Sequence, residues 1–488
     1  MREAFCGALA ASLVLVTLTI PNAALKDAKP RRIDLRPCDL TGIPGGGRCG
    51  TLEVYENRVA KTGRRIALNL IVIPAVGHAS AAEPVFWLEG GPGGAATQAI
   101  GPVSQQYLRG LRRDHDLVFV DQRGTGKSSP LICDLGDSPT DLDRYFGPLL
   151  PRDLVRACRE RLERTADLTQ YTTSIAADDL DDVREALGFQ EINIAGASYG
   201  TRVALVYMRR HPAHVRSAFL VGVAPTDFEL PLPFARAAQH ALDLTLSDCA
   251  VDQSCHAAFP EAKHEFEAVL ARFERGQLRV EMTDPATDRK RAVALWRESY
   301  VEHLRLLLYT TFGARLVPVV VHQAFLGNFV PFETAAIQFN VGGGLARGMY
   351  LSVTCSEDVP FITEKQIAQE TRGTFLGDQR IRAHLAACTE WPRAAVPAGF
   401  HDPVKSDVPT VLYSGEADGS TPPWIAEAAA RFLSRGRLIQ VPHTGHQIAG
   451  PCAWDLMRDF IGHPSARDLD ASCAAGTKRP PFATEVPQ

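Results

Sequence analysis

Short apolar runs alternate with helix-like segments over the first half of the chain. Residues 84–88, 116–120 and 192–195 are mostly apolar, and each run leads into a glycine-rich loop. A strand without a polar face is typical of a parallel sheet that is covered on both sides. Residues 177–187 and 201–210, which precede and follow the third run, have helical spacing. This order predicts a doubly wound, mostly parallel sheet of the α/β class.

The pattern changes at about residue 225 and changes back at about residue 400. Between these points the apolar residues recur with helical spacing, and prolines break the runs. Strand-like runs return at 408–415 and 437–441. We therefore expect a helical cap inserted into the sheet. The predicted parts are a signal peptide at 1–24, an α/β core at 25–224 and 401–475, a helical cap at 225–400 and a C-terminal tail at 476–488.

The N-terminus has the features of an export signal. Arg2 precedes an apolar run over residues 4–20, and small residues follow at 23–24. An uncleaved membrane anchor is the alternative, although the run is shorter than the roughly 20 residues that span a bilayer. We expect a cleaved signal peptide and a secreted or periplasmic protein with no stable membrane insertion.

The cysteines agree with export. The chain has 11, of which Cys6 lies in the predicted signal and the other ten form five couples of sequence neighbours. An even number in an exported chain favours disulfides, and the lack of a C-x-x-C couple argues against a zinc knuckle. Spacing alone leaves the connectivity open, and pairing of neighbours is the simplest prediction. The predicted pairs are Cys38–Cys49, Cys133–Cys158, Cys249–Cys255, Cys355–Cys388 and Cys452–Cys473.

Charge and glycine-rich loops narrow the range of ligands. The 488-residue chain has a formal net charge of −4, so it lacks the basic field that nucleic-acid binding requires. Two loops resemble nucleotide-binding motifs only loosely. In the loop at 91–96, which resembles a dinucleotide-binding motif, Pro92 removes a backbone amide. In the loop that ends at 124–128, Asp121 stands where a phosphate-binding loop needs its first glycine. We expect no nucleic-acid partner and no cofactor.

Residues 196–200 read Gly-Ala-Ser-Tyr-Gly between a predicted strand and a predicted helix. This is the context of a nucleophile elbow, a sharp turn that presents Ser198 at the edge of the sheet. A serine nucleophile needs a histidine base and a carboxylate that orients it, and on this type of sheet both follow the serine. Asp418 and His446 each follow a later predicted strand. Ser198, Asp418 and His446 are the predicted catalytic triad.

Each partner has a rival of the same type nearby. Glu416 lies closer to its strand end than Asp418, where a structural role is expected. His443 precedes His446, but the glycine at 445 lets a tight loop deliver the second ring. The two histidines form an H-x-x-H pair without an acidic or cysteine partner, so no metal is expected.

The negative charge that develops during acyl transfer needs two N–H donors. One predicted donor is the amide of Tyr199, directly after the nucleophile. The other comes from the glycine-rich loop at 90–94, where Gly91 is the first choice and Gly90 the second.

These motifs together resemble the proline iminopeptidase and secreted tripeptidyl aminopeptidase branch of the α/β-hydrolases. The resemblance extends over nearly the whole chain after the predicted signal, and it implies an α/β-hydrolase fold with serine aminopeptidase activity. The segments that carry it are residues 89–94, 121–128, 196–200, 415–418 and 445–446.

The resemblance also implies the acids that bind substrate. Glu89 stands where proline iminopeptidases have a histidine. Cys355-Ser356-Glu357 is similar to the Cys-x-Glu segment of the tripeptidyl type, which implies that Glu357 holds the free amino group of the substrate. A carboxylate does this through a charge-assisted hydrogen bond. Glu357 and Glu89 are therefore the substrate-binding candidates, with Asp358 beside the first. A solvated acidic turn is the alternative for Glu357.

The predicted function is a secreted serine exopeptidase that acts on peptides with a free N-terminus, with prolyl or tripeptidyl specificity. The alternative is a carboxyl-ester hydrolase of the same fold, which needs no amine-binding acid. A non-catalytic binding scaffold usually lacks triad residues. Epoxide and haloalkane hydrolases carry an aspartate where this chain has Ser198.

Overall fold

The computed structural model describes residue 1 and residues 32–77, 83–101, 110–340, 344–447 and 450–486. Apart from its first residue, the predicted signal peptide lies outside the described residues. All described helices and strands belong to the compact unit Arg32–Gln488.

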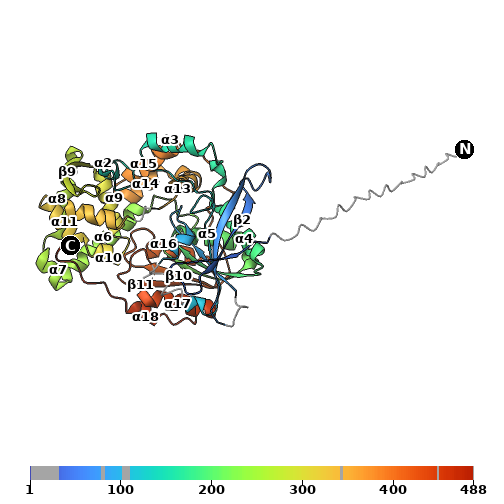
Figure 1. Cartoon of the computed structure of the whole chain (residues 1–488). Coiled ribbons are helices and arrows are strands. Elements are labelled where there is room, and N and C mark those ends of the chain that lie inside the picture. Colours follow the sequence, from blue (N-terminus) through green and yellow to red (C-terminus); the bar gives the residue numbers. More distant parts are fainter. Residues whose placement is uncertain (2–31, 78–82, 102–109, 341–343, 448–449, 487–488) are drawn as a thin grey trace. The chain divides into compact units, whose positions relative to one another are not determined.

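A nine-stranded sheet runs through this unit (Figure 1), in the order β1-β2-β3-β5-β4-β6-β7-β10-β11. The pairings from β1 to β5 are antiparallel, and those from β5 to β11 are parallel. The predicted doubly wound, mostly parallel sheet is confirmed. Its strands are β1 (Arg36–Cys38), β2 (Gly47–Tyr55), β3 (Arg65–Ile73), β4 (Val85–Leu88), β5 (Leu117–Val120), β6 (Ile192–Ala197), β7 (Val215–Val221), β10 (Thr410–Gly415) and β11 (Gly436–Val441).

The chain reverses its direction of travel across the sheet at β4. From β4 it moves to β5 on one side, and it returns to β6 on the other side. In open α/β sheets, ligands bind at the carboxyl ends of the strands beside such a switch point. The register pairs Leu88 at the end of β4 with Gly196 near the end of β6. The loops that follow these two strands therefore leave the sheet next to each other.

Alternate residues of a strand enter different apolar layers, because successive side chains point to opposite faces. In β5, Val118 packs with residues of α4 (Thr173–Leu187) and α5 (Tyr199–Arg210), whereas Phe119 packs with α17 (Gly450–Gly462). Both faces of the parallel strands are thus covered, which explains why their sequences are almost continuously apolar.

Between β7 and β10 the chain forms a mainly helical layer with an apolar core of its own. Helices α6, α8, α9 and α11 lie together in this layer (Figure 1). The layer is not purely helical as predicted, because β8 (Leu278–Asp284) and β9 (Arg289–Leu295) form an antiparallel hairpin. Val280 and Val293 pair across it and enter the core, and the alternation of apolar residues in both strands is the signal that a helical interpretation overlooked.

The helices of this layer are α6 (Phe234–Val251), α7 (Gln253–Ala258), α8 (Ala262–Arg272), α9 (Arg297–Leu307), α10 (Thr311–Ala314), α11 (Val317–Phe325), α12 (Val330–Gln338), α13 (Arg347–Val353), a π-helical turn (Thr354–Asp358), α14 (Glu364–Thr371) and α15 (Gln379–Cys388). Elsewhere lie α2 (Leu142–Tyr145), α3 (Arg152–Leu162), α16 (Pro423–Ala430) and α18 (Ser472–Ala475). Within the described part of the chain, no single helix has the length and apolarity of a membrane span, although the bent pair Arg297–Leu307 and Thr311–Phe325 meets both criteria together.

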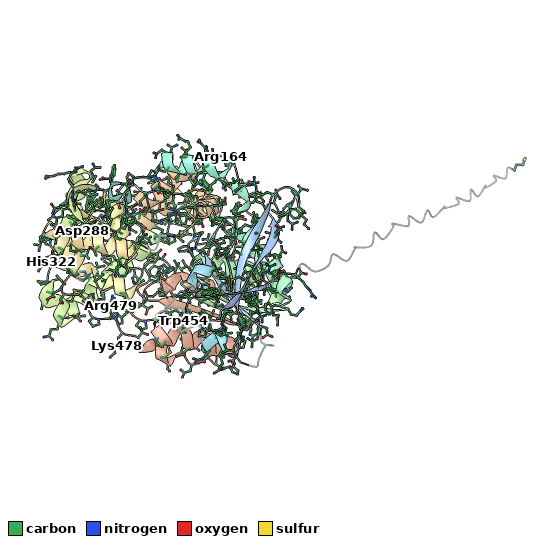
Figure 2. The ribbon with its side chains drawn as sticks, in the orientation of Figure 1. Arg164, Asp288, His322, Trp454, Lys478 and Arg479 are labelled. Carbon is green, nitrogen blue, oxygen red and sulfur yellow. A yellow bond between two sulfur atoms is a disulfide. The ribbon has the colours of Figure 1, made fainter. Side chains whose placement is uncertain are left out.

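The C-terminal residues return to the helical layer. Phe482 belongs to the apolar core of this layer. Arg479, which is labelled in Figure 2, donates from Nε to Oδ2 of Asp248 in α6 over 2.7 Å. The same carboxylate oxygen lies 3.2 Å from Nδ1 of His443, in the loop after β11. Asp248 therefore joins the helical layer, the tail and that loop.

Five disulfides are present, and all five predicted pairs are confirmed. They close loops of very different lengths. The Cys249–Cys255 bond joins the neighbouring helices α6 and α7 across a sequence separation of 6. The Cys355–Cys388 bond joins the π-helical turn to the end of α15 across a separation of 33.

Removal of a disulfide should cost more stability when the loop that it closes is longer, because the cross-link restricts the unfolded chain. We expect the double variant Cys355→Ser/Cys388→Ser to lose about 4 kcal/mol of unfolding free energy, and Cys249→Ser/Cys255→Ser to lose about 2 kcal/mol. Urea unfolding of the purified variants measures both losses. Equal losses would show that local packing, and not loop length, sets the cost.

Candidate active site

The turn between β6 and α5 holds Ser198 in a backbone conformation that side chains rarely adopt. Its φ is 54° and its ψ is −125°. The amide of Ser198 donates to the carbonyl of Val221 over 2.8 Å, which ties the turn to β7. A Cβ at Gly200 would lie 2.1 Å from the carbonyl oxygen of Leu88, so only glycine lets α5 begin this close to β4. This is the geometry of a nucleophile elbow.

The structure brings Asp418 and His446 into contact at the carboxyl ends of β10 and β11. Asp418 Oδ2 lies 2.7 Å from His446 Nδ1, and the carboxylate is fully buried. Its Oδ1 accepts hydrogen bonds from the amides of Ser420 and Thr421, both over 2.8 Å. These bonds fix the carboxylate, and the contact with Nδ1 leaves the other ring nitrogen of His446 for a second partner.

Burial and pairing act in opposite directions on this pair. Burial by itself raises the pKa of Asp418, but the charge and hydrogen bond of His446, with two backbone amides, outweigh it and hold that pKa below its usual value. Burial by itself lowers the pKa of His446, but the charge and hydrogen bond of Asp418 outweigh it and raise that pKa above its usual value. The aspartate therefore stays ionised and favours a proton on His446.

The two rival residues contact each other. Glu416 Oε2 accepts a hydrogen bond from the amide of His443 over 3.0 Å. His443 also reaches Asp248, as described above. Both rivals thus support the loop that carries His446, and neither makes the contact between acid and imidazole that Asp418 makes.

Two further residues hold His446, and sequence reasoning did not identify either. The Thr421 hydroxyl lies 2.9 Å from Asp418 Oδ2 and 3.0 Å from His446 Nδ1. The backbone carbonyl of Tyr309 accepts a hydrogen bond from the amide of His446. The Tyr309 ring packs edge-on against the imidazole, with 5.0 Å between the ring centroids. Thr421 could have been found from its position in the turn after Asp418. Tyr309 comes from the helical layer, and no local pattern marks it.

A cavity of about 250 Å³ opens onto Ser198 and His446. Gly90 and Gly91, from the loop after β4, line it as well. The Gly90 amide donates to Glu89 Oε1 over 3.1 Å, whereas the Gly91 amide has no hydrogen-bond partner among the described residues. Tyr199 is the first residue of α5, where helix amides have no partner within the helix. The amides of Gly91 and Tyr199 are thus open donors beside Ser198.

Of the two predicted substrate-binding acids, the structure places Glu89 on the wall of this cavity. Its side chain is only partly buried. Oε2 accepts a hydrogen bond from Trp87 Nε1 over 2.8 Å, and Oε1 accepts the Gly90 amide. Each carboxylate oxygen can accept a further hydrogen bond, so Glu89 can receive a cationic group that enters the cavity.

Glu357 is not brought to the cavity wall. Its side chain is fully buried, and its two oxygens accept hydrogen bonds from the amide and the hydroxyl of Thr173, both over 2.6 Å. Arg202 lies between the two acids of this segment, 3.8 Å from Glu357 and 2.9 Å from Asp358. The Thr173 hydroxyl also contacts the Tyr199 hydroxyl over 2.7 Å. This buried cluster packs against α5 through Tyr199 and Arg202. Glu357 is fully buried, so the alternative of a solvated acidic turn is wrong.

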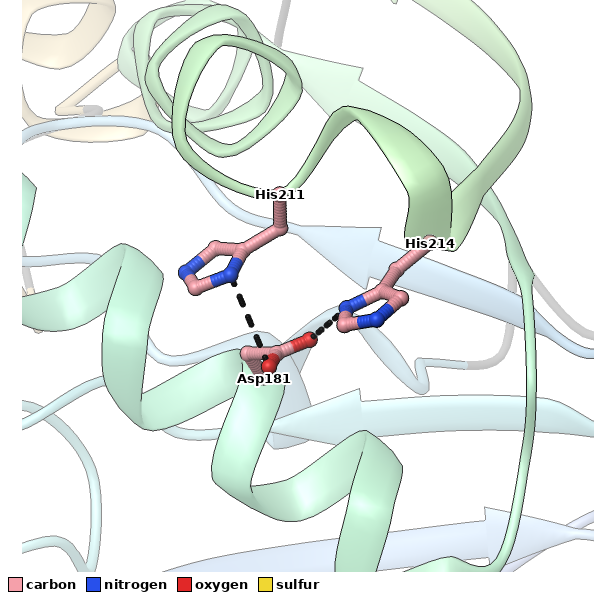
Figure 3. A group of neighbouring side chains, drawn as sticks. All are labelled: Asp181, His211 and His214. Atoms are coloured by element: carbon pink, nitrogen blue, oxygen red, sulfur yellow. Dashed lines mark hydrogen bonds and ion pairs between the residues drawn. The ribbon is translucent and has the colours of Figure 1, made fainter.

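Among the described residues, one group combines metal-binding residue types: Asp181, His211 and His214 (Figure 3). His214 Nδ1 lies 2.7 Å from Asp181 Oδ1, and His211 Nδ1 lies 3.5 Å from Oδ2. Arg184 and Tyr207 also donate to Oδ1, over 2.7 and 2.8 Å. Because a guanidinium already occupies the carboxylate, this group is a salt-bridge network that ties α4 to the end of α5.

Comparison with known proteins agrees with this geometry. A family model described as alpha/beta hydrolase fold matches residues 83–257, and one described as TAP-like protein matches residues 373–473. The serine protease Hip1 of Mycobacterium tuberculosis is 25% identical over 491 residues and covers 90% of each chain. The tripeptidyl aminopeptidase of Streptomyces lividans is 29% identical over 212 residues, which are 40% of this chain and 39% of that protein. The proline iminopeptidase of Neisseria gonorrhoeae is 27% identical over 141 residues, 29% of this chain and 32% of that one.

A mostly parallel sheet with a serine at a strained strand-to-helix turn defines the α/β-hydrolase class. The chain has this fold, and its sequence is similar to the branch that includes the tripeptidyl aminopeptidases and proline iminopeptidases.

The buried cluster makes stability depend on pH. Burial raises the pKa of Asp358 to about 7, against an ordinary value of 3.8. The folded protein thus holds this proton more tightly, so the contribution to stability is present below the ordinary pKa and is lost as pH rises through about 7. Because only the parent loses this contribution, we expect the change in unfolding free energy from pH 5 to pH 8 to be more favourable in Asp358→Asn than in the parent. Urea unfolding at both pH values tests this, and identical pH dependence of the two proteins would contradict it.

Proposed function

We propose that this protein is a serine peptidase that removes residues from peptides with a free N-terminus. The observation that carries the proposal is the strained Ser198, which shares a cavity with a histidine held by a buried aspartate. The resemblance to tripeptidyl aminopeptidases and proline iminopeptidases supports action on peptides. The five disulfides support export, since such bonds persist in oxidising compartments.

In the proposed reaction Ser198 attacks the carbonyl carbon of the scissile bond, and His446 accepts the hydroxyl proton on Nε2. Asp418 keeps the other ring proton on Nδ1 and stabilises the imidazolium that forms. The amides of Gly91 and Tyr199 donate to the developing oxyanion. His446 then protonates the leaving amine. A water molecule hydrolyses the acyl-enzyme by the same proton transfers in reverse, which regenerates Ser198.

We assign recognition of the substrate ammonium to Glu89. Its carboxylate lines the cavity that contains Ser198 and is not neutralised by a lysine or arginine in any described contact. A carboxylate in a partly dry cavity binds an ammonium through charge-assisted hydrogen bonds. Glu357 offers no such site, because it is buried and already paired with Thr173.

The triad assignment predicts different effects for the two neighbouring acids. Asp418→Asn should lower kcat/KM by a factor on the order of 10⁴, because the amide favours the wrong tautomer of His446. Ser198→Ala should abolish turnover. Glu416→Gln keeps the shape and the hydrogen bond to the His443 amide, so we expect less than about a tenfold loss. Initial rates on peptide amides measure all three, and full activity in Asp418→Asn with loss in Glu416→Gln would reverse the assignment.

The role of Glu89 predicts selectivity for a free N-terminus. Glu89→Gln removes a charge-assisted contact, so kcat/KM on free peptides should fall about 10- to 150-fold while N-acetylated peptides, which start lower, change little. Simple acyl esters should be hydrolysed at nearly the parent rate. Glu357→Gln is the matched control, and it should leave the ratio of free to acetylated substrates unchanged. Equal cleavage of free and acetylated peptides by the parent enzyme would refute the aminopeptidase proposal and favour an ester hydrolase.

A further inference from the structure

A second cavity, of about 140 Å³, lies directly beside the catalytic one. The two share three wall residues: Gly91, Tyr309 and Leu345. Gly91 is the proposed oxyanion donor, and Tyr309 packs against His446. When a substrate is held at Ser198, a group close to its reacting carbonyl can therefore enter the second cavity.

Arginine dominates the polar lining of this cavity. Four arginines face two acids, and both acids are already paired. Asp137 receives two hydrogen bonds from Arg347, over 2.7 and 2.8 Å. Glu302 accepts two hydrogen bonds from Arg305, over 2.5 and 3.1 Å. Its Oε1 also lies 2.5 Å from Nη1 of Arg380. The fourth arginine is Arg144, at the more exposed edge.

The remaining polar groups do not cancel this positive charge. Burial lowers the pKa of His384 to about 3 and also lowers that of His303, so both rings are neutral near pH 7. Arg144 pairs with Asp134, which lies outside the cavity, over 3.4 Å, so one of the four guanidinium charges has no acidic counterpart. Within the described chain, Arg305 Nη1 and Arg380 Nε are also buried without a hydrogen-bond partner. Buried donors without acceptors are costly, and an anionic ligand would satisfy them.

The shape and charge favour a carboxylate over other charged groups. An ammonium would meet an uncompensated positive charge here. The planar guanidinium fork matches the two oxygens of a carboxylate, whereas a lysine would offer only a point charge. An apolar cavity of about 150 Å³ holds a benzene molecule, so a cavity of this volume has room for the acidic end of one amino acid.

We propose that this cavity is a carboxylate-binding subsite, which makes peptides with a carboxylate next to the scissile bond the preferred substrates. The proposal rests on the proposed peptidase function. The carboxylate comes either from an acidic side chain or from the C-terminus of a short peptide, and the two sources share the same chemistry.

Arg380→Gln is the variant that tests the subsite. It removes one uncompensated charge, while Glu302 keeps its bond to Arg305 and is not left alone. Arg382→Gln is the matched control, because Arg382 lies on the same helix but pairs with Glu364 and Asp378 outside the cavity. Should Arg380→Gln lower the Tm, Arg144→Gln at the exposed edge provides a second variant.

The substrates are short peptides with Glu or Gln on either side of the scissile bond, each prepared as a C-terminal acid and as an amide. We expect the parent enzyme to prefer one acidic form over its neutral match by about 10- to 100-fold in kcat/KM. Arg380→Gln should lower that preference about tenfold, with neutral peptides changed less than about threefold, and Arg382→Gln should preserve it. A preference for Glu over Gln identifies an acidic side chain as the source of the carboxylate. A preference for the C-terminal acid over the amide identifies the C-terminus.

Rapid cleavage of peptides without any preference for an acidic form would overturn the subsite and leave the proposed function intact. If only acyl esters are hydrolysed, the peptidase proposal fails and the subsite is tested separately. The same acidic and neutral peptides then serve as inhibitors of ester hydrolysis. Stronger inhibition by acidic forms, lost in Arg380→Gln, would support the subsite, and equal inhibition would refute it.

Discussion

The strained backbone at Ser198 is the constraint on which the surrounding structure depends. A left-handed serine costs on the order of 1–3 kcal/mol, and it persists only where its neighbours leave the chain no other path. Three strands impose that path here, because β6 leads into the turn, β7 binds the Ser198 amide and β4 receives Gly200 against its last carbonyl. The positions of Ser198 and of the Tyr199 amide are therefore set by the sheet and not by a flexible loop.

Sequence reasoning succeeded where a local pattern and local chemistry coincide. The parallel strands are apolar because both faces are buried, and each candidate catalytic residue lies in the turn or loop that follows one of them. The β8–β9 hairpin was missed because its alternation lies within a long helical stretch. Tyr309 and the arginines of the second cavity were missed for another reason. The arginines come from four helices, and Tyr309 lies in the turn after one of them, and no spacing along the chain shows that these segments converge.

The two acids Glu89 and Glu357 show what a resemblance can and cannot carry over. Glu357 is acidic as in the tripeptidyl type, whereas Glu89 replaces the histidine of the proline iminopeptidases. Their surroundings decide what each carboxylate does. Glu357 is enclosed with Thr173 and Arg202 and serves the packing of α5, whereas Glu89 keeps accepting capacity on the wall of the catalytic cavity. Burial and partners depend on the tertiary structure, so residue type alone could not separate the two.

The contacts of Asp248 give the end of the chain a part in holding the loop that carries His446. One carboxylate oxygen in α6 meets both Arg479, 231 residues further along the chain, and His443, three positions before His446. Loss of the residues after Lys478 would leave that oxygen with His443 alone and remove Phe482 from the apolar core of the helical layer. Removal of this tail by a protease would thus loosen the loop around His446 from a point more than thirty residues further along the chain.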